Sequence, residues 1–399
     1  MDLAIKDVRR HAGKFAATVV GVGLLVAVVL VMNGIYRGNI ADGLWLVDHT
    51  DVDLWVVERG RGGPFNEPSR VSQELYRSVA AFPGVLQASP FITYTVQREL
   101  AGESRQFTII GYDVLGGLGG PPEVKAGRSI RASRFEIVAD KKLGLRVGQR
   151  LHLGLRDYVV VGLVSGAVDM GGNPLLYMAL PDAQEVLYQQ DNEAIRSARV
   201  ATRRDIEAHG YSETEAQRLQ PLASAGDVPT IAAVLVKLSP GQNIDAVKRG
   251  VEERLFLSAF TTAEERDLLL EGRLTKMTAM LGLFRTLLVF VSVVIMALII
   301  YVLTMEKIRA IATLKLIGAP NSVIVRMILE QSLMLSVLAF TVAYALVSTT
   351  QDRFPRTLVL ETFDTAVTFG VILAGGVGAS VLAILRALRV PPGLALGGG

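Results

Sequence analysis

Four long stretches of the chain carry no charged side chain. They lie between Phe15 and Tyr36, Thr286 and Met305, Gln331 and Gln351, and Thr365 and Leu385. Each is about as long as the roughly 20 residues that a helix needs to cross the hydrocarbon core of a bilayer. Buried helices of soluble proteins usually keep a polar stripe, which these stretches lack. The pattern predicts a membrane protein with four transmembrane α-helices, one near the N-terminus and three in the last third.

The first stretch has a second interpretation, a cleaved signal peptide, because basic residues precede it. Its apolar part exceeds the roughly 7 to 15 residues of a signal core. It also runs directly into Asn33-Gly34-Ile35-Tyr36-Arg37 without an A-x-A-like cleavage site. We therefore expect it to remain in the protein as the first transmembrane helix.

Basic residues in the short flanks predict the orientation, since long loops cross the membrane largely regardless of charge. They are Lys6, Arg9, Arg10 and Lys14 before the first helix, Lys307, Arg309 and Lys315 between the second and third, and Arg386 and Arg389 after the fourth. All three clusters fall on one side of the membrane, which is therefore the cytoplasm. Both termini are then inside, and the segment from Arg37 to about Met277 is outside.

The external segment is predicted to fold rather than to act as a tether, because strand-like and helix-like runs alternate with turns. The strand-like runs are Asp51–Val57, Phe91–Leu100, Arg105–Tyr112, Phe135–Ala139, Tyr158–Leu163 and Ile231–Leu238. After the last run come the turn Ser239-Pro240-Gly241 and a helix to about Phe256. We expect an α+β domain interrupted by a polar, charge-rich insert at about 190–228.

The run from Thr262 to Thr275 has a helical pattern that continues into the second transmembrane helix and predicts a stalk. A separate surface helix with a kink at Gly272 is the alternative. The resulting plan is 1–36 (cytoplasmic N-terminus and first helix), 37–261 (external domain), 262–305 (stalk and second helix), 306–322 (cytoplasmic helix), 323–349 (third helix), 350–363 (short external link), 364–388 (fourth helix) and 389–399 (cytoplasmic tail).

Charge and composition exclude several classes of function. The 41 basic and 38 acidic residues leave a net charge of +3, too small for a nucleic-acid partner. There is no cysteine, and the four histidines (His11, His49, His152 and His209) lie far apart in the sequence, so we expect no metal site. Neither a G-x-S-x-G nor a G-x-x-x-x-G-K-[ST] motif occurs. The chain is therefore not expected to be an enzyme.

Directly after the second transmembrane stretch comes a run from Met305 to Pro320 that predicts a short cytoplasmic helix. Gly318 suits its C-terminal stop, and Pro320 prevents its continuation. Its apolar face consists of Ile308, Ile311, Ala312 and Leu316. Such a face needs a cover, which composition alone leaves open between a groove in a partner protein and lipid headgroups.

The same run, Met305-Glu306-Lys307-Ile308-Arg309-Ala310-Ile311-Ala312-Thr313-Leu314-Lys315-Leu316-Ile317-Gly318-Ala319-Pro320, resembles the signature E-x-x-x-E-I-A-x-L-K-A-I-G-A. That signature belongs to the ABC permeases of the macrolide-exporter, lipoprotein-release and cell-division family, whose one-plus-three helix layout is also similar. Asp53-Leu54-Trp55-Val56-Val57 and the run from Gly63 to Arg70 further resemble the heterocyst-glycolipid-exporter branch. Ala310 departs from the pattern, since the family usually has a second Glu there.

The resemblance implies an inner-membrane permease whose large domain is periplasmic and whose cytoplasmic helix docks a separate ABC ATPase. The docking residues would be Glu306, Ile308, Arg309, Ile311, Ala312, Leu314, Lys315, Leu316 and Gly318. The partner would bind the ATP, so this chain needs no cofactor. Further implied partners are a second copy in a homodimer, a periplasmic adaptor (membrane-fusion) protein and an outer-membrane duct, for export of an amphiphilic or lipid-like cargo.

The membrane helices themselves favour transmission of force over passage of cargo. No ionisable residue lies near the centre of a span, and Arg326 and Glu330, four residues apart, can pair at the inner end of the third. Gly21, Gly23, Gly375 and Gly376 favour close helix packing. A periplasmic ligand sensor is the alternative function, although only about a dozen residues, with no signalling module, follow the last span.

Overall fold

The computed structural model describes residues 12–100, 102–188, 204, 229–351, 354 and 357–389. The chain forms two compact units: a helical unit, Met1–Ile40 with Lys276–Gly399, and a sheet unit, Ala41–Thr275. The predicted polar insert at about 190–228 lies outside the described residues apart from Arg204, as do the predicted tail beyond Arg389 and the basic residues before Lys14.

The sheet unit contains a ten-stranded mixed sheet with the order β12-β1-β11-β3-β4-β9-β6-β8-β5, and β7 pairs with β8. Only β4 with β9 and β6 with β8 are parallel, while β10 and β2 form a separate antiparallel pair. The strands are β1 (Leu54–Val57), β2 (Val71–Ser72), β3 (Val85–Leu100), β4 (Glu103–Tyr112), β5 (Ala126–Gly127), β6 (Glu136–Asp140), β7 (Arg150–Leu153), β8 (Arg156–Val164), β9 (Leu175–Ala179), β10 (Thr230–Ile231), β11 (Ala233–Leu238) and β12 (Ser258–Thr261). All six strand-like runs of the sequence are thereby confirmed as strand positions, although Ala232 divides the last into β10 and β11.

Short helices complete the sheet unit. They are α3 (Gly63–Asn66), α4 (Leu75–Ala80), residues 180–188, α7 (Ile244–Leu255) and α8 (Thr262–Leu269), and α8 continues into a π-helix, η2 (Leu270–Leu274). The N-cap of α7 is Asn243, whose side chain accepts hydrogen bonds from two backbone amides in the first turn, Asp245 N and Ala246 N. This cap explains why the helix begins directly after the turn that the sequence predicts.

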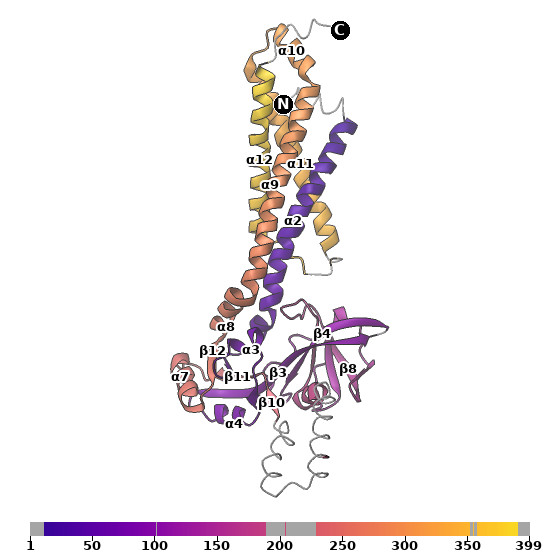
Figure 1. Ribbon diagram of the computed structural model, residues 1–399. Helices are drawn as coiled ribbons and strands as arrows, with labels where there is room; N and C mark the ends of the chain where they lie inside the picture. The colour runs from indigo at the N-terminus through magenta and orange to yellow at the C-terminus, as the bar shows by residue number, and fades with distance from the viewer. Residues whose placement is uncertain are drawn as a thin grey trace. The chain divides into compact units, whose positions relative to one another are not determined.

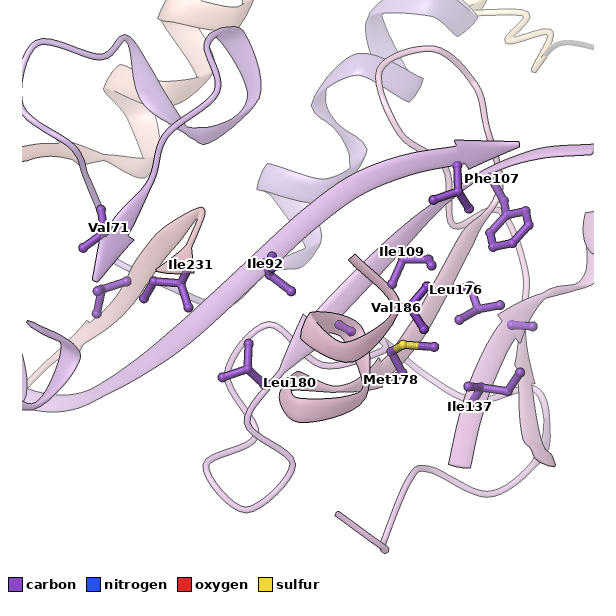
Figure 2. Close-up of a cluster of buried hydrophobic side chains, with 14 of the residues drawn as sticks. Val71, Ile92, Phe107, Ile109, Ile137, Leu176, Met178, Leu180, Val186 and Ile231 are labelled. Atoms are coloured by element: carbon purple, nitrogen blue, oxygen red, sulfur yellow. The ribbon is translucent and has the colours of Figure 1, made fainter. Parts of the chain in front are cut away.

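The core of the sheet unit follows from the alternation of its strands (Figure 2). Ile92 of β3, Ile109 of β4 and Met178 of β9 are buried on one face, where the helix at 180–188 adds Val186. Because each such side chain stabilises the fold by about 1.5 to 3 kcal/mol on burial, neighbouring strands with apolar residues on the same face hold one register.

The helical unit contains α2 (Ala12–His49) as far as Ile40, α9 (Thr275–Glu306) from Lys276 onward, α10 (Ile308–Leu316), α11 (Asn321–Thr350) and α12 (Thr362–Leu388), drawn in Figure 1. Four of them, all except α10, are long and apolar enough to cross a membrane. The structure differs from the sequence prediction in α2, which continues past Tyr36 to His49. Residues 262–306 are helical without interruption, including the π-helical turn around Gly272.

Small residues bring the four long helices together. Ser332 Oγ of α11 donates a hydrogen bond of 2.7 Å to Gly376 O of α12. A Cβ at Gly376 would overlap Ser336 Oγ, and one at Gly375 would lie 2.9 Å from Val293 of α9. A Cβ at Gly23 would lie 3.1 Å from Ala339 O of α11, whereas one at Gly21 would meet no atom within 4 Å. Three of the four predicted glycines thus lie at close contacts, and Gly21 does not.

The described part of the 350–363 link packs on α2, a contact that the sequence did not predict. A Cβ at Gly38 would overlap Thr357 O, and one at Gly34 would lie 2.7 Å from Leu358. Between these glycines, Arg37 forms ion pairs with Asp364 and with Glu361, the latter at 3.0 Å. Glycines four residues apart on α2 let the link lie directly on the helix.

Substitutions of two glycines on α12 test this packing. We expect Gly376→Leu to destabilise the helical unit by about 1 to 3 kcal/mol, because the new side chain meets both serines of α11. Gly378→Leu is the matched control, since a Cβ there meets nothing within 4 Å. Thermal unfolding of the full chain in detergent measures both, and equal melting temperatures for the two variants would contradict the packing.

Candidate functional site

The short helix α10 ends where the sequence predicts, at Gly318. Lys307 separates the two helices, with φ −96° and ψ 8°. Gly318 ends α10 in the left-handed region, with φ +88°, and its amide donates to Lys315 O at 3.1 Å. The next amide, Ala319 N, donates to Leu314 O at 3.0 Å, so the last carbonyls of the helix are satisfied. Pro320 then precedes α11.

The predicted docking residues of α10 differ in burial, and their role in docking stays a prediction from the sequence. Ile311 and Ala312 are fully buried in the core of the helical unit itself, where Ile311 belongs to the same cluster as Ile324 and Ile328 of α11. Ile308 and Leu314 are half-buried. A helical apolar stripe looks the same whether it covers a neighbouring helix or a partner, so the sequence could not distinguish these two covers.

Lys315 anchors α10 to α12. Its Nζ donates hydrogen bonds to Leu388 O at 2.7 Å and to Ala387 O at 3.2 Å. These carbonyls belong to the last turn of α12, where a cation also stabilises the negative end of the helix dipole. Lys315 thus has a structural role within this chain, because it joins α10 to the end of α12.

The exposed tip of α10, which we define as Leu316, Ile317 and Gly318, is the apolar surface that remains. Ile317 is 79% exposed and Leu316 is 45% exposed. Ile317 was not singled out in the sequence, and its exposure follows from its position directly after the last residue of α10. Arg309 is exposed beside this turn.

Glu306 makes a contact that the sequence did not predict. One of its carboxylate oxygens, Oε2, lies 3.7 Å from Lys14 Nζ at the start of α2. Both side chains are more than half exposed, so the pair contributes little to stability. Arg326 and Glu330 form the predicted pair at 2.9 Å on α11.

In the sheet unit, α8 is held at its N-terminus by several polar contacts. Thr261 and Glu264 form a capping box, and Glu264 also accepts hydrogen bonds from Lys248 Nζ at 2.6 and 2.7 Å. Arg266 Nη1 donates to Asp48 Oδ1 of α2 at 3.0 Å. The start of α8 is therefore tied both to α7 and to the last turn of α2.

The π-helical turn η2 continues this contact with α2. Leu274 is 2% exposed, and a Cβ at Gly43 of α2 would lie 2.8 Å from its side chain. A Cβ at Gly272 would lie 3.5 Å from Asn66 of α3. Gly43 thus lets α2 approach η2 closely, and we name the set Gly43, Asp48, Arg266 and Leu274 the α2–α8 clamp.

Glu265 is a buried carboxyl group beside this clamp. Its side chain is 0% exposed, and neither carboxylate oxygen has a hydrogen-bond partner among the described residues. Burial raises the pKa of Glu265 to about 8. A Cβ at Gly63 would overlap both oxygens, and the φ of +84° at Gly63 is itself one that favours glycine. The run Gly62-Gly63-Pro64 thus lets α3 close over a neutral Glu265.

No group of three or more His, Cys, Asp or Glu side chains within the described residues is arranged to hold a metal ion. A cavity of about 530 Å³ lies in the sheet unit between the end of α2, α3 and strands β3 and β4. Its floor includes Thr95 and Thr108, whose hydroxyls lie 2.8 Å apart, and Asp169, which accepts a 2.6 Å hydrogen bond from Thr108. The three side chains therefore satisfy one another's hydrogen bonds.

Four membrane-spanning helices with a large sheet domain between the first and second define a multi-pass membrane protein. Two family models match it: the MacB-like periplasmic core domain over residues 15–254 and the FtsX-like permease C-terminal domain over residues 282–392. The chain belongs to the ABC transporter permeases of the MacB/FtsX type. It is a multi-pass inner-membrane protein with a large periplasmic domain, so the α10 turn lies on the cytoplasmic side.

Relatives that match over 99% of their length are also described as ABC transporter permeases. An uncharacterized ABC transporter permease of Mycobacterium tuberculosis (H37Rv), Rv2563, is 24% identical over 400 residues, 99% of each chain. A second from that strain, Rv0072, is 22% identical over 395 residues, again 99% of each chain. The crystal structure of the periplasmic region of MacB from Actinobacillus actinomycetemcomitans has a TM-score of 0.36 and 11% identity, covering 56% of this chain and 96% of that one. The heterocyst-glycolipid branch stays a prediction from the sequence.

The buried Glu265 predicts a pH dependence. Its pKa is about 8 in the folded protein and about 4.3 in the unfolded chain, so the folded state holds the proton more tightly. The free energy of unfolding is therefore highest below about pH 4.3. It falls by about 1.4 kcal/mol for each pH unit as the pH rises from there through 8. We expect Glu265→Gln to remove this slope.

Thermal unfolding from pH 5 to 8, followed by the fluorescence of Trp55 between Phe65 and Phe91, measures the effect. The exposed Glu253→Gln on α7 is the control and keeps the wild-type slope. A wild-type slope in Glu265→Gln would show that another group titrates.

Proposed function

We propose that this permease is the non-catalytic subunit of an ABC exporter. In this proposal cytoplasmic ATPase subunits dock on the exposed tip of α10, and their ATP-driven motion passes through the membrane helices to the periplasmic domain. The observation that carries the proposal is the tip itself, because a 79% exposed isoleucine ends a cytoplasmic helix that Lys315 ties to α12. An exposed apolar side chain on a rigid turn is typical of a docking surface.

In this proposal the residues of the tip and the predicted docking residues fall into an exposed group and a buried group. Leu316, Ile317 and Gly318, with the exposed Arg309, would contact the partner. Ile311 and Ala312 would support them from within the core, so that a push on the tip displaces α10 as a rigid element. Packed cores transmit strain because they have few voids, which supports transmission through the unit.

Transmission, rather than a channel, is supported by the interior of the helical unit. The contacts at Gly375 and Gly376 fill the space between α9, α11 and α12 with side chains. The charged residues of the four helices lie outside the four charge-free stretches, among them Arg37, Glu306 and Arg386. A cargo pathway through this unit would need polar lining that the stretches lack.

The periplasmic half of the machine is proposed on the sequence resemblance. We propose a homodimer that works with a periplasmic adaptor and an outer-membrane duct and exports an amphiphilic or lipid-like cargo. The apolar side chains that α9 exposes, including Leu283, Leu287 and Phe290, would face lipid or the second copy. A periplasmic ligand sensor is the second candidate, and the cavity of about 530 Å³ in the sheet unit favours it. A sensor requires no ATPase on α10.

The docking step is tested by Ile317→Asp. A charge at a desolvated anchor position costs 2 kcal/mol or more, so we expect about 30-fold less ATPase to co-purify with the variant. The permease itself is expected to fold normally, because the side chain is exposed. Leu155→Asp is the matched control, since Leu155 is 76% exposed in the periplasmic sheet unit. This variant is expected to co-purify with as much ATPase as the wild type.

Ile311→Asp serves as a second comparison. Because Ile311 is fully buried, we expect this variant to lose thermal stability before any effect on docking can be measured. Unchanged ATPase association in Ile317→Asp, at normal expression, would reject docking through the tip. The absence of any co-purifying ATPase from the wild-type chain would favour the sensor instead.

A further inference from the structure

A groove of about 470 Å³ runs along the helical unit between α9 and α12, next to their cytoplasmic ends. Its walls are Ala297, Leu298 and Tyr301 of α9 and Leu382 and Leu385 of α12. The leucines are half exposed or more, and no other described element lines the groove. The groove is therefore apolar and opens on the outer surface of the helical unit.

Two arginines, Arg386 and Arg389, line the same groove at the C-terminal end of α12. Both are exposed, and within the described part of the chain neither guanidinium forms a hydrogen bond or an ion pair. Their spacing of three residues places them on one face of the helix. An apolar groove with two free guanidinium groups at its end fits a molecule with an apolar tail and an anionic head.

The surrounding charges do not neutralise these arginines. Glu306 pairs with Lys14, and Glu330 pairs with Arg326. Lys315 adds a further cation at the last turn of α12, where it binds the carbonyls of Ala387 and Leu388. Both of these carboxylates thus have basic partners of their own, and the groove lining contains two arginines and no acidic residue.

The location of the groove determines which amphiphile is at hand. The flanks of α9 and α12 at this end are cytoplasmic, so the arginines lie at the headgroup level of the inner leaflet. Anionic phospholipids attract basic side chains at this surface, and basic pockets between transmembrane helices bind their headgroups. Tyr301 suits the same interfacial depth, with an apolar ring and a polar hydroxyl.

We propose that this groove binds an anionic phospholipid. The phosphate accepts hydrogen bonds from Arg386 and Arg389, and one acyl chain lies along Leu298 and Leu382. A second copy of the chain is the competing occupant of an apolar groove. It fits less well, because an interface there would remove two guanidinium groups from water without supplying carboxylates from any described residue nearby.

A bound lipid would hold the end of α12 that Lys315 joins to α10. The two arginines extend from the same turn whose carbonyls Lys315 binds. The headgroup and the lysine would then fix this turn from two sides. The site is independent of the proposed docking of an ATPase, because it uses the permease and the bilayer alone.

The test uses the purified full chain, without ATPase, in lipid nanodiscs. Phosphatidylglycerol and phosphatidylcholine carrying a spin label on one acyl chain report the fraction of each lipid that the protein immobilises. We expect clear selectivity for phosphatidylglycerol in the wild type. Each of Arg386→Gln and Arg389→Gln is expected to weaken it about five-fold, which corresponds to roughly 1 kcal/mol for one basic residue at an anionic surface.

Arg309→Gln is the charge-matched control, because Arg309 is exposed at the same end but does not line the groove, and its selectivity is expected to equal that of the wild type. Leu382→Trp fills the groove and should release both lipids. Equal immobilisation of the two lipids by the wild type, or unchanged selectivity in both arginine variants, would overturn the proposal. So would arginine variants that alter only the dimer content measured by native mass spectrometry, since that result assigns the groove to a second copy.

Discussion

The α2–α8 clamp is the constraint on which the account depends. Two helical segments run from the helical unit into the periplasmic domain: α2, and the continuous run from α9 back through η2 to α8. Within the sheet unit they are joined by the ion pair between Arg266 and Asp48 and by Leu274 against Gly43. Strand β1 follows α2, strand β12 precedes α8, and the two strands pair with each other at the edge of the large sheet. The clamp is therefore joined directly to that edge.

A buried carboxyl group supports the clamp within the sheet unit, whereas the helical unit has an exposed apolar tip on α10. Glu265 and Gly63 close α3 over α8 with a carboxyl group that burial keeps neutral. At the opposite end of the long helical run, α10 is bound to α12 through Lys315, and its tip is exposed. In the proposed function this tip receives the partner, and the close-packed helices transmit its motion.

Much of this architecture was available in the sequence. Charge-free stretches predicted the four long helices, and alternating apolar residues predicted the strands, because bilayer thickness and the pleat impose these patterns. Gly318 and Pro320 marked the end of α10 for equally local reasons. The burial of Ile311 was not predictable, since an amphipathic stripe does not specify its cover. The pairing of Asp48 with Arg266, 218 residues apart, and the extension of α2 to His49 depend on tertiary contacts that periodicity does not encode.

The central claim is that the ends of α2 and α8 move as one body when the transporter works. The chain has no cysteine, so His49→Cys with Asp267→Cys places one spin label on the last residue of α2 and one on α8. Electron paramagnetic resonance then measures the distance between the labels with the partner ATPase present, in the nucleotide-free and ATP-trapped states. The account predicts one narrow distribution that is the same in both states. A distribution that shifts or broadens on ATP trapping would contradict it, because the clamp would then open during the cycle.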